Sequence, residues 1–202
     1  MSESQHDTRE AWLLAGVSLL HARFTEAGYG VPDNVRVTCG WPSKGALARK
    51  HQRIGECWAD SMSKGKVFEI FISPTLAEPV HVLDVLTHEL VHATVGLKAK
   101  HGKVFKRCAL AVGLEGKMRW TNAGAELVKA LTGYANTLGH YPHDELEHMT
   151  TGERKQGTRL IKAECGVCGY TVRVTRKWLD LAGAPLCPSE DCDNHGTPLG
   201  LE

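Results

Sequence analysis

The chain has 202 residues, of which 42% are hydrophobic and 23% charged, and its formal net charge is +1 at pH 7. These values are ordinary for a globular protein, and the length predicts one domain of about 150 residues followed by a small module. No apolar run reaches the roughly 18 residues that a membrane span needs, so we expect no membrane partner. The polar, acidic N-terminus is unlike an export signal, which favours a cytoplasmic location.

The first part of the chain predicts one helix followed by three strands. A helical pattern capped by Asp7 runs to about Ala27, where glycines and a proline end it. Residues 34–39, 53–59 and 67–73 then have the character of strands. We expect these three strands to form a small antiparallel sheet beneath the helix that follows them.

The helix expected over residues 80–97 carries the sequence His88-Glu89-Leu90-Val91-His92. Histidines four residues apart lie on one face of a helix, where both imidazoles can hold one Zn²⁺ ion at about 2.0–2.1 Å. Glu89 is then placed to take a proton from a zinc-bound water, as a general base. The alternative is a helix whose histidines are simply exposed to solvent. A third histidine downstream argues against this alternative.

That third histidine decides the subclass of the site. The extended pattern His-Glu-x-x-His-x-x-Gly-x-x-His would need glycine at 95 and histidine at 98, but the chain has Val95 and Lys98. Gly96 is instead a typical end for the helix. A short loop then delivers His101-Gly102 at the start of another helical pattern, whose apolar face runs to Leu114. A further helix is expected over residues 123–138.

Four cysteines near the C-terminus indicate a second zinc site: Cys165, Cys168, Cys187 and Cys192. Two close pairs of thiolates suit a closed tetrahedral site of structural type, with Zn–S distances of about 2.3 Å. The wider spacing of the second pair leaves His195 as an alternative to Cys192. A disulfide framework is not expected, because the chain has 7 cysteines and a core large enough without crosslinks. The other three cysteines are predicted to be buried and reduced.

The stretch His88-Glu89-Leu90-Val91-His92-Ala93, the short loop and His101-Gly102-x-x-Phe105 together resemble the SprT-like metalloproteases, which include the Spartan proteases. The resemblance implies a zincin-like α+β domain in which His88, His92 and His101 bind catalytic zinc and Glu89 is the general base. Members of the family often add a C-terminal zinc ribbon, which the four cysteines match. The resemblance also implies protein substrates that are bound to DNA.

The expected organisation has three parts. An α+β zincin-like domain over residues 8–139 packs its active-site helix on the small antiparallel sheet, and a polar linker over 140–156 leads to a β-rich, four-cysteine zinc ribbon over 157–200. The cofactors expected are one catalytic and one structural zinc ion. Tyr134 and Tyr141 are the candidates for stabilising the oxyanion. The sequence leaves the oligomeric state open.

Basic residues gather in three segments. Residues 36–66 hold seven lysines and arginines against two acidic residues. The other two segments lie around His101 and over residues 159–177, which include the expected ribbon hairpin: Lys98, Lys100, Lys103, Lys106, Arg107, Arg159, Lys162, Arg173, Arg176 and Lys177. Such clusters suit a polyanion such as DNA, although a solvated surface explains them equally well. The function expected is zinc-dependent hydrolysis of peptide bonds in nucleic-acid-bound proteins. One alternative is a nucleic-acid-binding or transcription-associated zinc protein without protease activity, and another is a metal-dependent hydrolase of non-peptide bonds.

Overall fold

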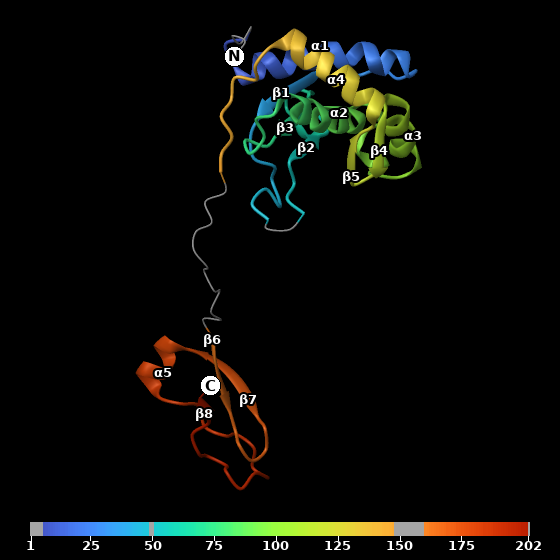
Figure 1. The fold of residues 1–202 in the computed structure, drawn as a ribbon. Coiled ribbons are helices and arrows are strands. Elements are labelled where there is room, and N and C mark those ends of the chain that lie inside the picture. The colour runs from blue at the N-terminus through green and yellow to red at the C-terminus, as the bar shows by residue number, and fades with distance from the viewer. Residues whose placement is uncertain (1–5, 49–50, 148–159, 202) are drawn as a thin grey trace. The chain divides into compact units, whose positions relative to one another are not determined.

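The computed structural model describes residues 6–48, 51–147 and 160–201. The chain divides into two compact units, Met1–His148 and Met149–Glu202 (Figure 1). Both units combine helices with small sheets, so the fold class is α+β. Most of the predicted linker, including His148, lies outside the described residues. In the described parts of the chain, no helix combines the length and the apolar character needed to cross a bilayer.

Helix α1 (Arg9–Glu26) opens the N-terminal unit and confirms the first predicted helix. Its N-cap is Thr8 and not Asp7, because the helix begins one residue later than predicted. The Thr8 hydroxyl accepts a hydrogen bond from the backbone N–H of Ala11 at 3.1 Å and so satisfies a free donor of the first turn. The inner face of α1 is fully buried at four large side chains: Trp12, Leu13, Leu20 and Phe24.

The three predicted strands are present as β1 (Val35–Cys39), β2 (Gly55–Trp58) and β3 (Phe68–Ile72). Their order in the sheet is β1-β3-β2, with β2 antiparallel to β3 but β1 parallel to it. The prediction of an antiparallel sheet is therefore wrong for one of the two pairings. Residues 40–67, which include β2 and the short 3₁₀ helix η1 (Asp60–Met62), form the long crossover that a parallel pair needs. This crossover leaves β2 at an edge of the sheet.

Helix α2 (Pro79–Val95) is the central helix of the N-terminal unit (Figure 1). The Glu78 carboxylate caps it by accepting two backbone N–H groups of the first turn, at 2.9 and 2.6 Å. Gly96, with φ of 80°, ends the helix, as predicted. Helix α2 packs against both β2 and β3 and also against α4 (Ala125–Leu138). It is therefore held on several sides, which fixes the position of the side chains that it carries.

A hairpin that the sequence did not predict follows the third helix of the unit. After α2 come the 3₁₀ helix η2 (Leu97–Ala99), α3 (Lys103–Val112), and the strands β4 (Leu114–Lys117) and β5 (Trp120–Ala123). Gly113 ends α3 with φ of 98°, in the left-handed region. Only the first residue of β4 is buried and none of β5, so the hairpin lacks the alternation of apolar residues that indicates strands.

The segment after α4 belongs to the N-terminal unit, although the sequence assigns it to the linker. The indole N–H of Trp12 donates to the carbonyl of Gly139 at 3.1 Å. Tyr141 is fully buried, with its ring centroid 4.9 Å from that of Trp12. The Nε2 of His143 donates to the carbonyl of Pro74 at 2.8 Å. The predicted boundary at residue 139 therefore falls inside a packed region.

The C-terminal unit contains β6 (Leu160–Glu164), β7 (Thr171–Thr175), α5 (Arg176–Ala182) and β8 (Gly200–Leu201). Its three strands are antiparallel in the order β7-β6-β8. Helix α5 was not predicted, and it carries two basic residues that the sequence analysis places on the hairpin. The buried core of this unit is very small: Ala163, Cys165, Cys187, Cys192 and Leu199.

Candidate active site

Three histidine rings converge beside α2. His88 and His92 lie one turn apart on the helix, and His101 lies between η2 and α3. The Nε2 atom of His101 is 3.2 Å from that of His92 and 3.4 Å from that of His88. Ligand atoms about 2.0–2.1 Å from a tetrahedral ion lie about 3.3–3.4 Å from one another. The group can therefore hold one metal ion, and its geometry is compatible with zinc.

One aromatic ring supports all three imidazoles. Phe105, on the first turn of α3, is fully buried. Its ring centroid lies 5.0 Å from that of His88, 4.5 Å from that of His92 and 4.9 Å from that of His101. All three imidazoles therefore pack against the same apolar ring. Because Phe105 is part of α3, this packing limits the rotation of the histidine rings.

The histidines are held in the neutral form that binds metals. Burial, followed by repulsion from the neighbouring imidazole of His101, lowers the pKa of His88 to about 4. Burial and the charges of its neighbours lower the pKa of His92 to about 3. Burial also lowers the pKa of His101, and the guanidinium groups of Arg119 and Arg53 act in the same direction.

Glu89 is almost completely buried, with 6% of its surface exposed. Burial raises the pKa of its carboxyl group to about 8, while the charge of Arg53 and a hydrogen bond from the backbone N–H of Cys57 act in the opposite direction. A dication held by the adjacent imidazoles would also favour the ionised form. Within the described residues, Glu89 is not a member of the group that can hold the ion. With such a dication bound, the ionised carboxylate of Glu89 can accept a proton.

Gly55 allows Glu89 to lie against β2. A methyl group built on Gly55 would lie 2.6 Å from the Glu89 Oε1 atom, 3.0 Å from its Cγ and 2.7 Å from Val85 Cγ1. Separations below 3.0 Å are not tolerated without movement, so any larger residue here displaces the carboxylate. The sequence analysis assigns no role to this position, because the contact joins an upstream strand to α2 and leaves no local pattern.

We expect the substitution Gly55→Ala to damage activity more than stability. The added methyl group overfills the contact and destabilises the unit by about 1–3 kcal/mol. A displacement of the carboxylate by about 1 Å is expected to slow a reaction that uses Glu89 as a base by about 10²-fold. Thermal unfolding and the rate of that reaction should be measured together, with Gly133→Ala as control, since nothing lies within 4 Å of a methyl group there. Full activity in Gly55→Ala would show that the position of Glu89 is unimportant.

A cleft of about 740 Å³ lies over the histidine group. Residues 51–57, which lead into β2, line one part of it, and residues 119–122 of the hairpin line another. The rings of His51 and Trp120, from these two segments, have centroids 5.1 Å apart. Three cationic side chains also line the cleft: Arg53, Lys100 and Arg119.

The hairpin and the entry to β2 are the parts of the cleft that the sequence analysis missed. The hydroxyl oxygen of Thr121, on β5, lies 2.7 Å from the Nδ1 atom of His88. Gly113 could have indicated that α3 ends before Leu114, because glycine is typical of helix ends. No signal in the sequence indicates that Arg53 or Thr121 would meet α2, since both contacts are tertiary.

The two tyrosines suggested for the oxyanion do not line the cleft. Tyr141 is fully buried beside Trp12, and its phenol group lies next to the thiol of Cys39. Tyr134 lies on α4, partly buried against the core. Both candidates are therefore wrong.

The four C-terminal cysteines form the second group that can hold a metal ion. The sulfur atoms of Cys165 and Cys192 are 3.8 Å apart, and those of Cys168 and Cys187 are 3.6 Å apart. Sulfurs about 2.3 Å from a tetrahedral ion lie about 3.8 Å apart, whereas a disulfide needs about 2.05 Å. All four are free thiols with a spacing compatible with zinc.

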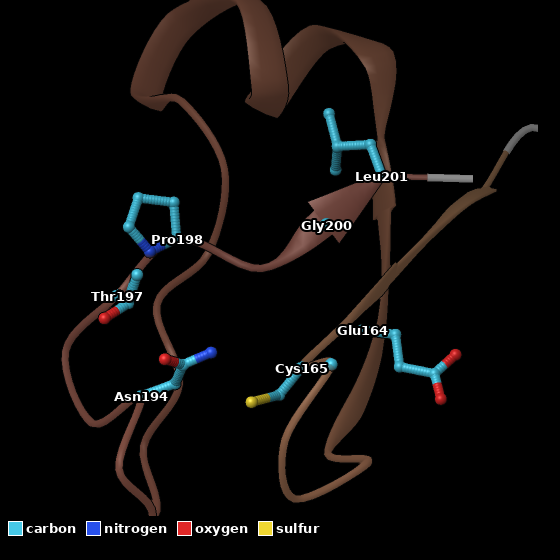
Figure 2. Close-up of a pocket in the computed structure, with 8 residues that line it drawn as sticks. Glu164, Cys165, Asn194, Thr197, Pro198, Gly200 and Leu201 are labelled. Carbon is cyan, nitrogen blue, oxygen red and sulfur yellow. The ribbon is translucent and has the colours of Figure 1, made fainter.

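The fourth member of this group is Cys192, and His195 is not part of it among the described residues. The backbone N–H of Asn194 donates to the Cys192 sulfur at 3.4 Å. A pocket of about 340 Å³ lies next to the cluster. Figure 2 shows Glu164 and Cys165 on one side of it, with Thr197 and Pro198 on the other.

The remaining cysteines belong to neither group among the described residues. Cys57 and Cys108 are buried and Cys39 is half-buried, and all three are free. Burial raises the pKa of each thiol, to about 11 for Cys108, so they are un-ionised near neutral pH. The predicted burial holds for Cys57 and Cys108 and only in part for Cys39.

Comparison of the chain with protein-family models, with characterised proteins and with solved structures gives no match.

Proposed function

We propose that the N-terminal unit is a zinc-dependent metalloprotease of the SprT-like, zincin type. The observation that carries the proposal is the convergence of three neutral imidazoles next to the buried carboxylate of Glu89. Catalytic zinc sites have three protein ligands and keep one position open, whereas structural sites are closed by four. Within the described residues the group offers three donors, and a cleft opens beside it.

The side chains of the site have separate roles in the proposed reaction. Zinc bound by His88, His92 and His101 would lower the pKa of a water molecule and polarise the scissile carbonyl. Glu89, which accepts a hydrogen bond from the Cys57 backbone N–H, would act as the general base that takes a proton from the attacking water and delivers it to the leaving amine. Arg119 lines the cleft and can stabilise negative charge on the carbonyl oxygen.

The edge position of β2 supports a peptide as the substrate. Within the described part of the chain, strand β2 pairs only with β3, and three of its residues, Gly55, Glu56 and Cys57, line the cleft together with Glu89. An extended peptide can add to such an edge through main-chain hydrogen bonds, which depend little on the peptide's sequence. This placement favours peptide-bond hydrolysis over hydrolysis of a compact non-peptide substrate.

Metal dependence tests the proposal directly. The zinc-loaded chain is expected to cleave an unstructured protein such as casein, or a DNA-bound protein in the presence of DNA. A chelator should abolish cleavage and added zinc should restore it, while His92→Ala should be inactive because it removes a ligand. His21→Ala is the control, since His21 is exposed on α1. Cleavage that survives both the chelator and His92→Ala would refute the proposal.

A zinc protein that binds nucleic acid without protease activity is the second candidate. It is favoured by the exposure of basic residues: all five between residues 98 and 107 are exposed, as are Arg173, Arg176 and Lys177. Trp178 is 53% exposed, with the Lys177 Nζ atom 5.5 Å from its ring centroid, and exposed aromatic rings can stack on unpaired bases. We propose that these basic segments, one in each unit, bind nucleic acid, and that the protein combines this binding with the protease activity.

Replacing Arg173, Arg176 and Lys177 with alanine is expected to weaken binding to nucleic acid about equally for all sequences, because interactions with phosphate carry no sequence information. The slope of log affinity against log salt should fall by about 0.9 for each phosphate of duplex DNA that the variant no longer neutralises. Cleavage of a DNA-bound protein should drop, and cleavage of a free peptide should not. Absence of binding to DNA and RNA at about 50 mM salt, where such interactions are strongest, would show that these residues are only a solvated surface.

A further inference from the structure

Helix α2 and strand β5 are joined by two polar contacts on the side of the helix that faces the cleft. The hydroxyl oxygen of Thr121 is 2.7 Å from the Nδ1 atom of His88. Two residues further along β5, the backbone N–H of Ala123 donates to the carboxyl group of Asp84. Asp84 and His88 are four residues apart on α2, and all of these residues except Ala123 line the cleft.

The spacing of the two contacts matches the geometry of both elements. Four residues of an α-helix rise about 6 Å, and two residues of a strand rise about 6.8 Å. Residues four apart on a helix share a face, and residues two apart on a strand share a side. Helix α2 and strand β5 therefore lie side by side so that both contacts form together. In this arrangement the Thr121 hydroxyl lies against the Nδ1 atom of His88, the ring nitrogen that does not face the other two histidines.

We propose that Thr121 is a positioning residue, which fixes the tautomer and ring orientation of His88 so that its Nε2 lone pair faces the metal position. The inference rests on the metal centre proposed above and deepens it. For Nε2 to bind a metal, the proton of the neutral ring must be on Nδ1, and this Nδ1–H group then donates a hydrogen bond to the Thr121 oxygen. A ligand histidine whose other nitrogen is held in this way is oriented before the metal arrives.

His92 provides a contrast within the same cluster. Its Nδ1 atom is buried and has no hydrogen-bond partner among the described residues, so its orientation depends on packing against Phe105. His88 combines packing with a directed hydrogen bond to a separate element. The unpredicted hairpin therefore does more than line the cleft, since it acts on one of the three ligands.

The test compares Thr121→Val with Thr121→Ser in the full chain. Valine has nearly the same shape as threonine but no hydroxyl, so zinc affinity should fall by about 10- to 100-fold. Serine keeps the hydroxyl and should restore affinity to within a few-fold of the native chain. Affinity is measured by titrating zinc against a colour-forming chelator after the cysteine cluster has been loaded. Thr132→Val is the matched control, because its hydroxyl is exposed and bonds only within α4.

A second measurement does not need metal at the histidine cluster. Nitrogen-15 chemical shifts of the His88 ring should show a proton on Nδ1 in the native chain and in Thr121→Ser, and a mixture of tautomers in Thr121→Val. If the valine variant does not fold, Thr121→Ala, which overfills nothing, replaces it. Equal zinc affinity and equal tautomer populations in the native and valine chains would overturn the inference. A native chain that binds no zinc at the histidines would instead overturn the metal centre, and the tautomer would then decide the role of Thr121.

Discussion

The substitution Glu89→Gln is expected to reduce peptide hydrolysis by at least about 10²–10⁴-fold, the range that a positioned general base contributes. Glutamine has the shape of glutamate but cannot take a proton from water. Its amide oxygen can still accept the Cys57 backbone N–H, so the local packing should remain. Because Glu89 is not part of the histidine group, both metal sites should stay filled.

Hydrolysis and metal content should be measured on the same preparation of Glu89→Gln. The control is Glu126→Gln, an identical change at an exposed residue of α4 that forms an ion pair with Lys129. We expect full activity and full metal content in the control. Loss of metal in Glu89→Gln would make Glu89 a ligand, and unchanged hydrolysis would place the base elsewhere.

The substitution Cys165→Ser is expected to unfold the C-terminal unit and leave the N-terminal unit folded. Three of the five buried residues in the core of the C-terminal unit are cysteines of the cluster, so little apolar surface remains to stabilise it without metal. Structural zinc contributes about 10–16 kcal/mol in small modules of this kind. Losing one of four thiolates removes most of that free energy.

Amide spectra of the two units should separate the effects, since only signals from residues 160–201 should collapse. Val167→Ser is the control, because Val167 lies in the same turn between two cluster cysteines and is 57% exposed. Metal analysis of the native chain should give two zinc ions. A single zinc ion, with all seven cysteines reacting at once in the folded protein, would contradict a metal-dependent C-terminal unit.

The sequence predicted those elements that depend on residues close together in the chain. The helix that carries the histidine motif follows from its apolar periodicity, its N-terminal proline and the glycine at its end. The convergence of His88 and His92 follows from helix geometry alone, whereas the sequence places Phe105 only on the apolar face of the next helix and in the motif that carries the family resemblance. The four cysteines follow from pairing along the chain in the same way.

Non-local contacts account for what the sequence analysis missed. The parallel pairing of β1 with β3 joins strands that are far apart in the chain, and the local pattern of either strand does not indicate its direction. Gly55 has its role only because Glu89, more than thirty residues later, packs against it. The hairpin of β4 and β5 has little alternation of apolar and polar residues, so the sequence did not predict its strands.

The packing of Tyr141 beneath Trp12 has a consequence for how the N-terminal unit is made. Almost the whole unit separates these residues in sequence, so their contact closes one of the longest loops that the unit can form. The contact between the two rings can therefore form only after the segment that follows α4 has been synthesised. A fragment that stops at residue 139 would keep every proposed catalytic side chain and still leave this aromatic pair unformed. The last residues of the unit to be made therefore complete the core that its first helix begins.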